Sequence, residues 1–244
     1  MALALFDLDH TLLNGCSTYA WNLFVGEEIL AGDREHLAMA DALHNNDKGG
    51  KSDFTIDDYY HFILKIYPQY SVAELHALTA RFVAERIEPI IHPRGREIVA
   101  RHRRRGDMTV MITATNKVIA EPISRLVDMD ALICTLPELV EGRYTGKVSG
   151  VPCYRQEKLN HLDGWMAARG LNLHGAYFYS DSHNDLPLLL RVDHPVAVDP
   201  DPVLLEHARR KGWQVLRFKE DELWRPGSQP ALISASWRRR YENK

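Results

Sequence analysis

The opening of the chain, ALALFDL over residues 2–8, is a short and nearly continuous apolar run. This is the pattern of a strand that is buried on both faces in a parallel sheet. Similar runs recur along the chain, at Met108–Ile112, Ala176–Tyr179, Pro195–Val198 and Trp213–Phe218. The sequence therefore predicts a parallel sheet built from these runs.

Helical stretches separate the apolar runs, at roughly Gly95–Arg105, Lys117–Val127, Gln156–Arg169, Asp185–Leu190 and Pro202–Lys211. Strands that alternate with helices form right-handed βαβ units, which place helices on both faces of one sheet. We therefore predict an α/β fold with a doubly wound parallel sheet.

One long interval, from Gly15 to about Glu88, interrupts this alternation because it has helix signals without a convincing buried strand. Thr55 opens one helix signal, and Ser71 with Glu74 has the form of a capping box. We expect a helical subdomain at 15–88, a core formed by 1–14 and 89–218, and a peripheral tail at 219–244. Within the core, Glu138–Ser149 has the composition of a small hairpin.

The bulk composition excludes several classes of partner. A formal charge of −3 over 244 residues leaves too little basic excess for nucleic acid as the main partner. The longest apolar runs fall short of the roughly 18 residues of a transmembrane helix, so we expect no membrane partner and a cytoplasmic location. The three cysteines lack C-x-x-C spacing and indicate a reducing compartment without a disulfide framework. The oligomeric state leaves no signal in the sequence.

Two acids, Asp7 and Asp9, come at the carboxyl end of the first predicted strand. Ligand sites form at this edge of open parallel sheets, and period-two alternation points both side chains to one side. One carboxylate could attack a phosphoryl group, and the other could protonate the leaving alcohol and then deprotonate water. Taken alone, the pair is equally compatible with two solvated loop aspartates.

Complementary residues follow in order along the chain. Thr113 ends the second predicted strand, Lys158 lies in a predicted helix, and the Asp181–Asp185 segment follows the third strand. Phosphoryl transfer needs cations around the transferring group, and hard oxygen ligands from two strand ends suit Mg²⁺. Each residue alone has a simpler account, as a strand cap, a surface cation or a helix cap.

Together these pieces resemble the haloacid dehalogenase superfamily of phosphatases. The resemblance is carried by FDLDHT, VMITAT, the lysine of YRQEK and YSDSHNDLPLL, in family order from residue 3 to about 200. The helical insert directly after the first motif is similar to the phosphoserine phosphatase branch. That branch implies a Rossmann-like core with a small helical cap.

The resemblance implies a role for each matched position. Asp7 would be the nucleophile and a Mg²⁺ ligand, and Asp9 would be the general acid and base, with its backbone carbonyl facing the metal. The phosphoryl group would be held by Thr113, Ala114 and Lys158, and Asp181 would bind Mg²⁺ with support from Thr11, Asn184 and Asp185. Glycine is frequent in the family where this chain has His10 and Ser180, and neither change removes an acid.

The substrate is expected to be a small phosphate monoester. Phosphoserine phosphatases have a glutamate shortly after the first motif that receives the substrate ammonium, whereas Leu13–Thr18 has no carboxylate. The stretch FDLDHTLLNGCSTYAWNLF is similar to a bacterial group that includes histidinol-phosphate phosphatases, which makes histidinol phosphate the leading candidate. Another phosphorylated alcohol or amine, such as phosphoserine, remains open. The rivals from other classes are a receiver-like signalling module and a binding module without catalysis.

Overall fold

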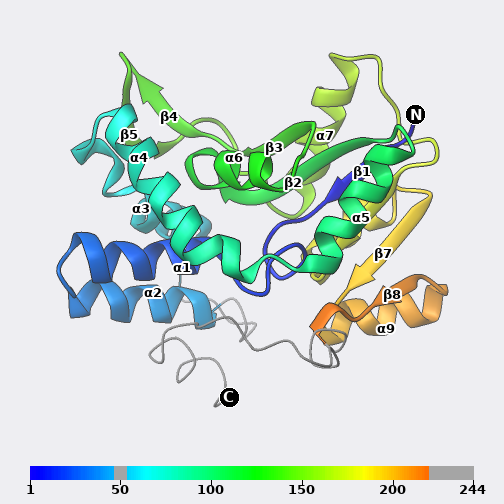
Figure 1. The fold of residues 1–244 in the computed structure, drawn as a ribbon, viewed down its shortest axis with the longest axis horizontal. Coiled ribbons are helices and arrows are strands. Elements are labelled where there is room, and N and C mark those ends of the chain that lie inside the picture. The colour runs from blue at the N-terminus through cyan, green and yellow to red at the C-terminus, as the bar shows by residue number, and fades with distance from the viewer. Residues whose placement is uncertain (47–53, 220–244) are drawn as a thin grey trace.

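The computed structural model describes residues 1–46 and 54–219, so the predicted tail lies outside the described residues apart from residue 219. Its centre is a parallel six-stranded sheet (Figure 1) with the order β3-β2-β1-β6-β7-β8. The strands are β1 (Leu3–Phe6), β2 (Met108–Asn116), β3 (Ala131–Thr135), β6 (Tyr177–Ser180), β7 (His194–Val198) and β8 (Gln214–Leu216). The predicted parallel sheet is confirmed.

Helices cover both faces of this sheet, as a doubly wound fold requires. One face carries α5 (Pro93–Arg104) and α6 (Lys117–Leu126), and the other carries α7 (Gln156–Ala167), α8 (Leu186–Leu189) and α9 (Pro202–Lys211). Alternate residues of β1 enter different buried clusters, Ala4 and Phe6 on the first face, Leu3 and Leu5 on the second. Both faces of β1 are therefore apolar, which explains its continuous apolar sequence.

Between β1 and α5, the named elements of the described part are all helices or helical turns. They are α1 (Ser17–Phe24), α2 (Arg34–Asn46), α3 (Ile56–Leu64) and α4 (Val72–Phe82), with π turns at Val25–Ile29 and Val83–Ile87 and 3-10 turns at Tyr67–Gln69 and Glu88–Ile90. Ser71 forms the predicted capping box of α4, and Thr55, predicted as a helix start, forms the capping box of α3. The four helices lie to one side of the sheet in Figure 1.

This helical segment shares its buried core with one face of the sheet. Trp21, Phe24 and Phe82 belong to the same hydrophobic cluster as Phe6 and Tyr179. The segment also returns to its starting point. The Asn14 N–H donates to the Ile90 carbonyl at 2.7 Å, and the His92 N–H donates to the Leu12 carbonyl at 2.9 Å.

Two strands differ in detail from the prediction, while the hairpin agrees with it. β3 was not predicted, although its sequence ALICT is a short run of mainly apolar residues. β2 continues to Asn116, so Thr113 lies within it rather than at its end, and its register with β3 shifts beyond Thr113. The predicted hairpin is present as β4 (Pro137–Val140) and β5 (Arg143–Val148), which pair antiparallel.

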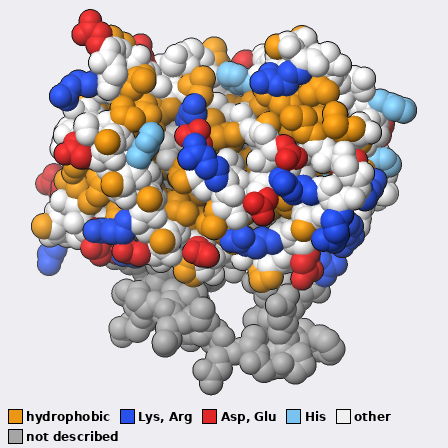
Figure 2. All heavy atoms as spheres, turned by 45° about the horizontal axis from the view of Figure 1, so that its top comes forward, with side chains coloured by type: hydrophobic (Ala, Val, Ile, Leu, Met, Phe, Trp, Pro, Cys, Tyr) orange, Lys and Arg blue, Asp and Glu red, His pale blue; other side chains and the backbone are white. Residues whose placement is uncertain are grey.

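The surface mixes charge signs. On the face shown in Figure 2, basic and acidic side chains are interspersed among hydrophobic ones. Within the described residues, no helix combines the length and the apolar character needed to cross a membrane.

Candidate active site

The predicted site lies where the strand order reverses, between the neighbouring strands β1 and β6. Loops that follow the two central strands diverge at such a point and leave room for a ligand. The loop after β1 carries Asp7, Asp9 and Thr11, and the loop after β6 carries Asp181 and Asp185. The Asp7 N–H donates to the Tyr179 carbonyl at 2.9 Å, which joins the two strands at the start of the site.

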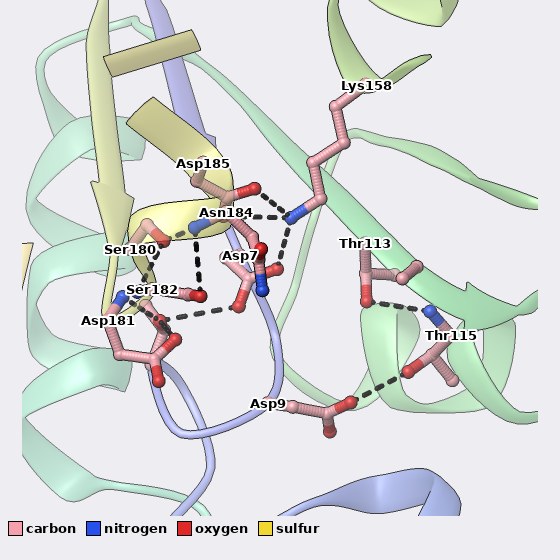
Figure 3. A network of polar contacts seen from close by, with 12 residues as sticks. Asp7, Asp9, Thr113, Thr115, Lys158, Ser180, Asp181, Ser182, Asn184 and Asp185 are labelled. Atoms are coloured by element: carbon pink, nitrogen blue, oxygen red, sulfur yellow. Dashed lines mark hydrogen bonds and ion pairs between the residues drawn. The ribbon is translucent and has the colours of Figure 1, made fainter. Parts of the chain in front are cut away.

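A buried cation links the two loops. Lys158, in the first turn of α7, donates from Nζ to Asp7 Oδ1 at 2.7 Å and to Asp185 Oδ2 at 2.9 Å (Figure 3). All three side chains are buried. Ser180 completes this cluster, because its hydroxyl donates to Asp185 Oδ2 at 2.7 Å. Lys158 is thus a fixed positive charge inside the site.

The pKa values reflect this shared cation. Burial raises the pKa of Asp7 to about 7, since the attraction of Lys158 is partly offset by repulsion from Asp185. Burial alone would lower the pKa of Lys158, but Asp185 and Asp7 outweigh it and raise that pKa. The attraction outweighs burial for Lys158 but not for Asp7, because Lys158 has two carboxylate partners while Asp7 shares its one cation with Asp185.

Asp181 lies on the other side of Asp7 and is joined to it through Thr11. The Thr11 hydroxyl is 3.2 Å from Asp181 Oδ1 and 3.5 Å from Asp7 Oδ2, and it accepts from the Asp181 N–H at 3.0 Å. Burial, followed by repulsion from Asp7 and Asp185, raises the pKa of Asp181 well above its ordinary value. The site therefore has more negative charge than its lysine balances.

Asp9 is held apart from this cluster by different groups. Its Oδ1 accepts from the Ser17 N–H at 2.6 Å, at the beginning of α1, and its Oδ2 accepts from the Thr115 hydroxyl at 2.9 Å. Burial raises the pKa of Asp9, against hydrogen bonds from Ser17 and Thr115 that lower it. The two acids of one strand end thus have separate environments, which suits two separate roles.

The carboxyl-terminal part of β2 supplies the side of the site next to Asp9. Thr113 is buried and accepts from the Thr115 N–H at 3.1 Å. The Ala114 carbonyl accepts from the Tyr60 hydroxyl at 2.7 Å, so α3 is hydrogen-bonded to this part of the strand. The structure therefore brings every predicted site residue to one edge of the sheet, with Thr113 on the same side of Asp7 as Lys158 in the view of Figure 3.

Several residues around the site were missed by the sequence prediction. Ser17 and Thr115 bind Asp9, Ser180 binds Asp185, and Arg155 donates from Nε to Asn184 Oδ1 at 3.0 Å. Thr115 had a signal, because it stands in the motif VMITAT two positions after Thr113. Short polar residues such as the serines have no pattern that marks them as partners of distant acids.

Four acids of the helical segment have their described contacts elsewhere than at the catalytic acids. Glu27 and Glu28 pair with arginines of the helical segment at distances of 3.3–3.5 Å, and Asp57 and Asp58 are exposed. Two tyrosines of the same segment lie nearer the site. Tyr60 donates to the Ala114 carbonyl of β2, and Tyr59 lines a cavity with Cys16 beside Asp9.

The donor set fits a hard divalent cation. Among the residues that the structure describes, no three His, Cys, Asp or Glu side chains converge to enclose an ion by themselves. Mg²⁺ does not need such a cage, because it takes one or two carboxylates and fills its remaining positions with water and substrate oxygens. Asp7 and Asp181, linked by one hydroxyl and raised in pKa by burial and then by repulsion from neighbouring acids, match that requirement.

Comparisons with known proteins agree with this geometry. A family model described as haloacid dehalogenase-like hydrolase matches residues 4–190. A histidinol-phosphatase of Neisseria meningitidis serogroup C is 40% identical over 221 residues, which cover 89% of this chain and 99% of the relative.

Solved structures show the same fold. A protein of unknown function from Bordetella pertussis Tohama I is 38% identical, with a TM-score of 0.83 over 89% of this chain and 98% of the other. A phospho-aspartyl intermediate analogue of phosphoserine phosphatase is similar in fold, with a TM-score of 0.61 at 16% identity over 89% of this chain and 93% of the other. The chain therefore belongs to the haloacid dehalogenase-like hydrolases, and it is a phosphatase of that family.

Proposed function

We propose that this phosphatase is Mg²⁺-dependent, that it acts through an aspartyl phosphate on Asp7, and that its substrate is histidinol phosphate. The observation that carries the mechanism is the separation of the two acids. Asp7 is held by a buried lysine, while Asp9 is held at a helix start with a raised pKa. The proposal places the enzyme in the cytoplasm.

The reaction begins with a carboxylate oxygen of Asp7 forming a bond to phosphorus while the bond from phosphorus to the alcohol oxygen breaks. The leaving oxygen takes the proton of the Asp9 carboxyl group, whose neutral form burial favours. Water then loses a proton to Asp9 and attacks phosphorus. Phosphate leaves, and Asp7 returns to its carboxylate form.

The remaining residues position the phosphoryl group. Lys158 holds Asp7 and supplies one positive charge, and Thr113 with the Ala114 backbone would bind the phosphoryl oxygens from the end of β2. Asp7, Asp181 and the Asp9 carbonyl would hold Mg²⁺, with support from Thr11, Asn184 and Asp185. When bound, Mg²⁺ supplies the positive charge that balances the equatorial phosphoryl oxygens.

We assign the choice of substrate to residues 15–88, as a cap over the site. Cys16 lies 4.0 Å from Asp9 Oδ2, so the beginning of this segment adjoins the proton donor of the leaving alcohol. The support for histidinol phosphate is the histidinol-phosphatase of Neisseria meningitidis, which is similar over nearly its whole length. The absence of a carboxylate in Leu13–Thr18 disfavours phosphoserine.

The mechanism is tested by hydrolysis of p-nitrophenyl phosphate with Mg²⁺ and with EDTA. We expect turnover only with Mg²⁺, loss of turnover in Asp7→Asn, and full activity in the exposed control Asp57→Asn. A phosphoryl group that hydroxylamine releases should accumulate on the wild type after acid quenching. Wild-type rates in Asp7→Asn would refute the nucleophile, and a stable aspartyl phosphate without turnover would favour the signalling module.

The substrate is tested separately by comparing kcat/KM over a panel of phosphorylated metabolites. We expect histidinol phosphate to rank first and phosphoserine to rank at least tenfold lower. If the enzyme hydrolyses the aryl phosphate but hydrolyses histidinol phosphate poorly, the substrate assignment is refuted and the mechanism is not.

A further inference from the structure

Arg155, just before α7, has a backbone conformation that side chains rarely adopt. Its φ is 51° and its ψ is −123°, and the Glu157 N–H donates to the Tyr154 carbonyl at 3.0 Å. These values describe a type II′ turn with Arg155 at the first central position, where glycine is strongly preferred. An arginine there strains the backbone, so some property of its side chain has to explain it.

The local fold gives no such explanation. Arg155 stands at the beginning of α7 but makes no side-chain capping bond to the helix. Its side chain is exposed, so it fills no core. A glycine would form the same turn without strain, because it lacks the Cβ that makes positive φ unfavourable.

The side chain of Arg155 instead reaches the catalytic loop after β6. Its Nε donates to Asn184 Oδ1 at 3.0 Å, and its guanidinium lies 4.9 Å from the centre of the Tyr154 ring. The Asn184 backbone N–H is held in turn by the Ser182 hydroxyl at 3.2 Å. Asn184 is therefore held through its backbone N–H and through its side-chain oxygen.

The hydrogen bond from Arg155 decides which end of the Asn184 amide remains for a ligand. With Oδ1 occupied by Arg155, that end is the amide nitrogen, and in the view of Figure 3 the Asn184 side chain projects over Asp7. Two basic residues at the beginning of α7 thus contact different parts of the site. Lys158 is buried against Asp7, and Arg155 is exposed at the edge of the site.

We propose that Arg155 is a positioning residue for phosphoryl transfer, retained at a strained backbone position because it holds the Asn184 amide N–H toward the phosphoryl group on Asp7. The inference rests on the proposed site at Asp7 but not on the identity of the alcohol that leaves. A generic aryl phosphate therefore tests it.

The decisive variant is Arg155→Gly, assayed with p-nitrophenyl phosphate and saturating Mg²⁺. We expect kcat to fall about ten- to a hundredfold, the range typical of residues that orient a reacting group, with little change in KM. The thermal unfolding temperature should stay the same or rise, because glycine relieves the turn. Added guanidinium ion should restore part of kcat in Arg155→Gly and none in Asn184→Ala.

Two further variants separate positioning from other roles. Arg155→Lys keeps a charge but cannot hold the Asn184 oxygen with the same geometry, so we expect a kcat close to that of Arg155→Gly. Asp128→Gly is the matched control, because Asp128 is also exposed with a positive φ of 56° but lies away from the site. It should keep wild-type kcat.

Wild-type kcat in Arg155→Gly or in Arg155→Lys would overturn the proposal. So would a loss of kcat in Arg155→Gly that adds fully to the loss in Asn184→Ala, since a residue that acts through another shows no additivity with it. A wild type without turnover of the aryl phosphate would instead contradict the proposed function.

Discussion

At the position of Asp7, the protein buries a carboxylate beside a lysine that it must share with Asp185. Such a cluster is costly to assemble, because removing charges from water is repaid only when geometry and hydrogen bonds are good. Here the distances of 2.7–2.9 Å and the Ser180 hydroxyl supply that compensation. Burial, together with repulsion among the acids, raises the pKa values of Asp7 and Asp181.

Removing the lysine should destabilise the fold as well as abolish turnover. Lys158→Met leaves two buried carboxylates without their cation, and we expect a loss of about 3–5 kcal/mol in the free energy of unfolding at pH 8. Urea denaturation measures it, with the exposed Lys147→Met as control. The loss should shrink at pH 5, because the unpaired acids take up protons. A loss that is the same at both pH values would contradict this account.

The raised pKa of Asp7 predicts a pH dependence of stability in EDTA. The folded protein holds this proton more tightly than the unfolded chain does, since the pKa is about 7 in one and 3.8 in the other. The contribution is therefore complete below pH 4 and is lost as the pH rises through about 7. Asp7→Asn should flatten the unfolding free energy between pH 4 and pH 7 relative to wild type. An unchanged slope would place the titration on another group.

The elements of the core could be predicted from sequence to a large extent. β1 and the helices that cover it have apolar patterns that follow from burial on known faces. β3 escaped because it is a short strand at the sheet edge, between α6 and the hairpin, where an apolar run has several possible explanations. The boundary of β2 was misplaced because its ladder becomes irregular beyond Thr113.

In the site, too, some residues could be predicted from the sequence and others could not. Asp7, Asp9, Lys158 and Asp181 stand in recognisable segments at strand or helix ends. Their partners depend on segments that meet only in the folded chain, as Thr115 meets Asp9 across 106 positions. Hydrogen-bonding side chains of this kind are set by three-dimensional packing, which a single sequence does not reveal.

Besides its apolar contacts, helix α3 is hydrogen-bonded to the core through the buried hydroxyl of Tyr60. The Tyr60 hydroxyl donates to the Ala114 carbonyl and lies 3.0 Å from the Thr135 hydroxyl. Tyr60→Phe removes this connection, and we expect a loss of about 1–3 kcal/mol in unfolding free energy because buried polar atoms lose their partner. Urea denaturation of Tyr60→Phe beside Tyr70→Phe measures it, and equal stability of the two variants would show that the connection is unimportant.

At the scale of the whole molecule, the surplus acids couple metal binding to stability. Mg²⁺ that binds only the folded protein raises the free energy of unfolding, by about 2.7 kcal/mol at a hundredfold excess over Kd. We expect Mg²⁺ to raise the thermal unfolding temperature more at pH 8 than at pH 5, because protons and metal compete for Asp7 and Asp181. In Asp181→Asn the increase in unfolding temperature caused by Mg²⁺ should largely disappear. An equal increase in the variant and in the wild type would show that the ion binds elsewhere.

The pinched base of the helical segment, where Leu12–Asn14 meet Ile90–His92, also bears on how such a protein can change over generations. Because the chain leaves and re-enters the core at one point, an intervening stretch can be lengthened, trimmed or exchanged without displacing the catalytic loop. The shared cluster sets the condition for such an exchange, since any replacement must offer an apolar face to Phe6 and Tyr179. At this junction the helical segment can therefore be replaced, and the substrate preference changed, while the catalytic residues stay in place.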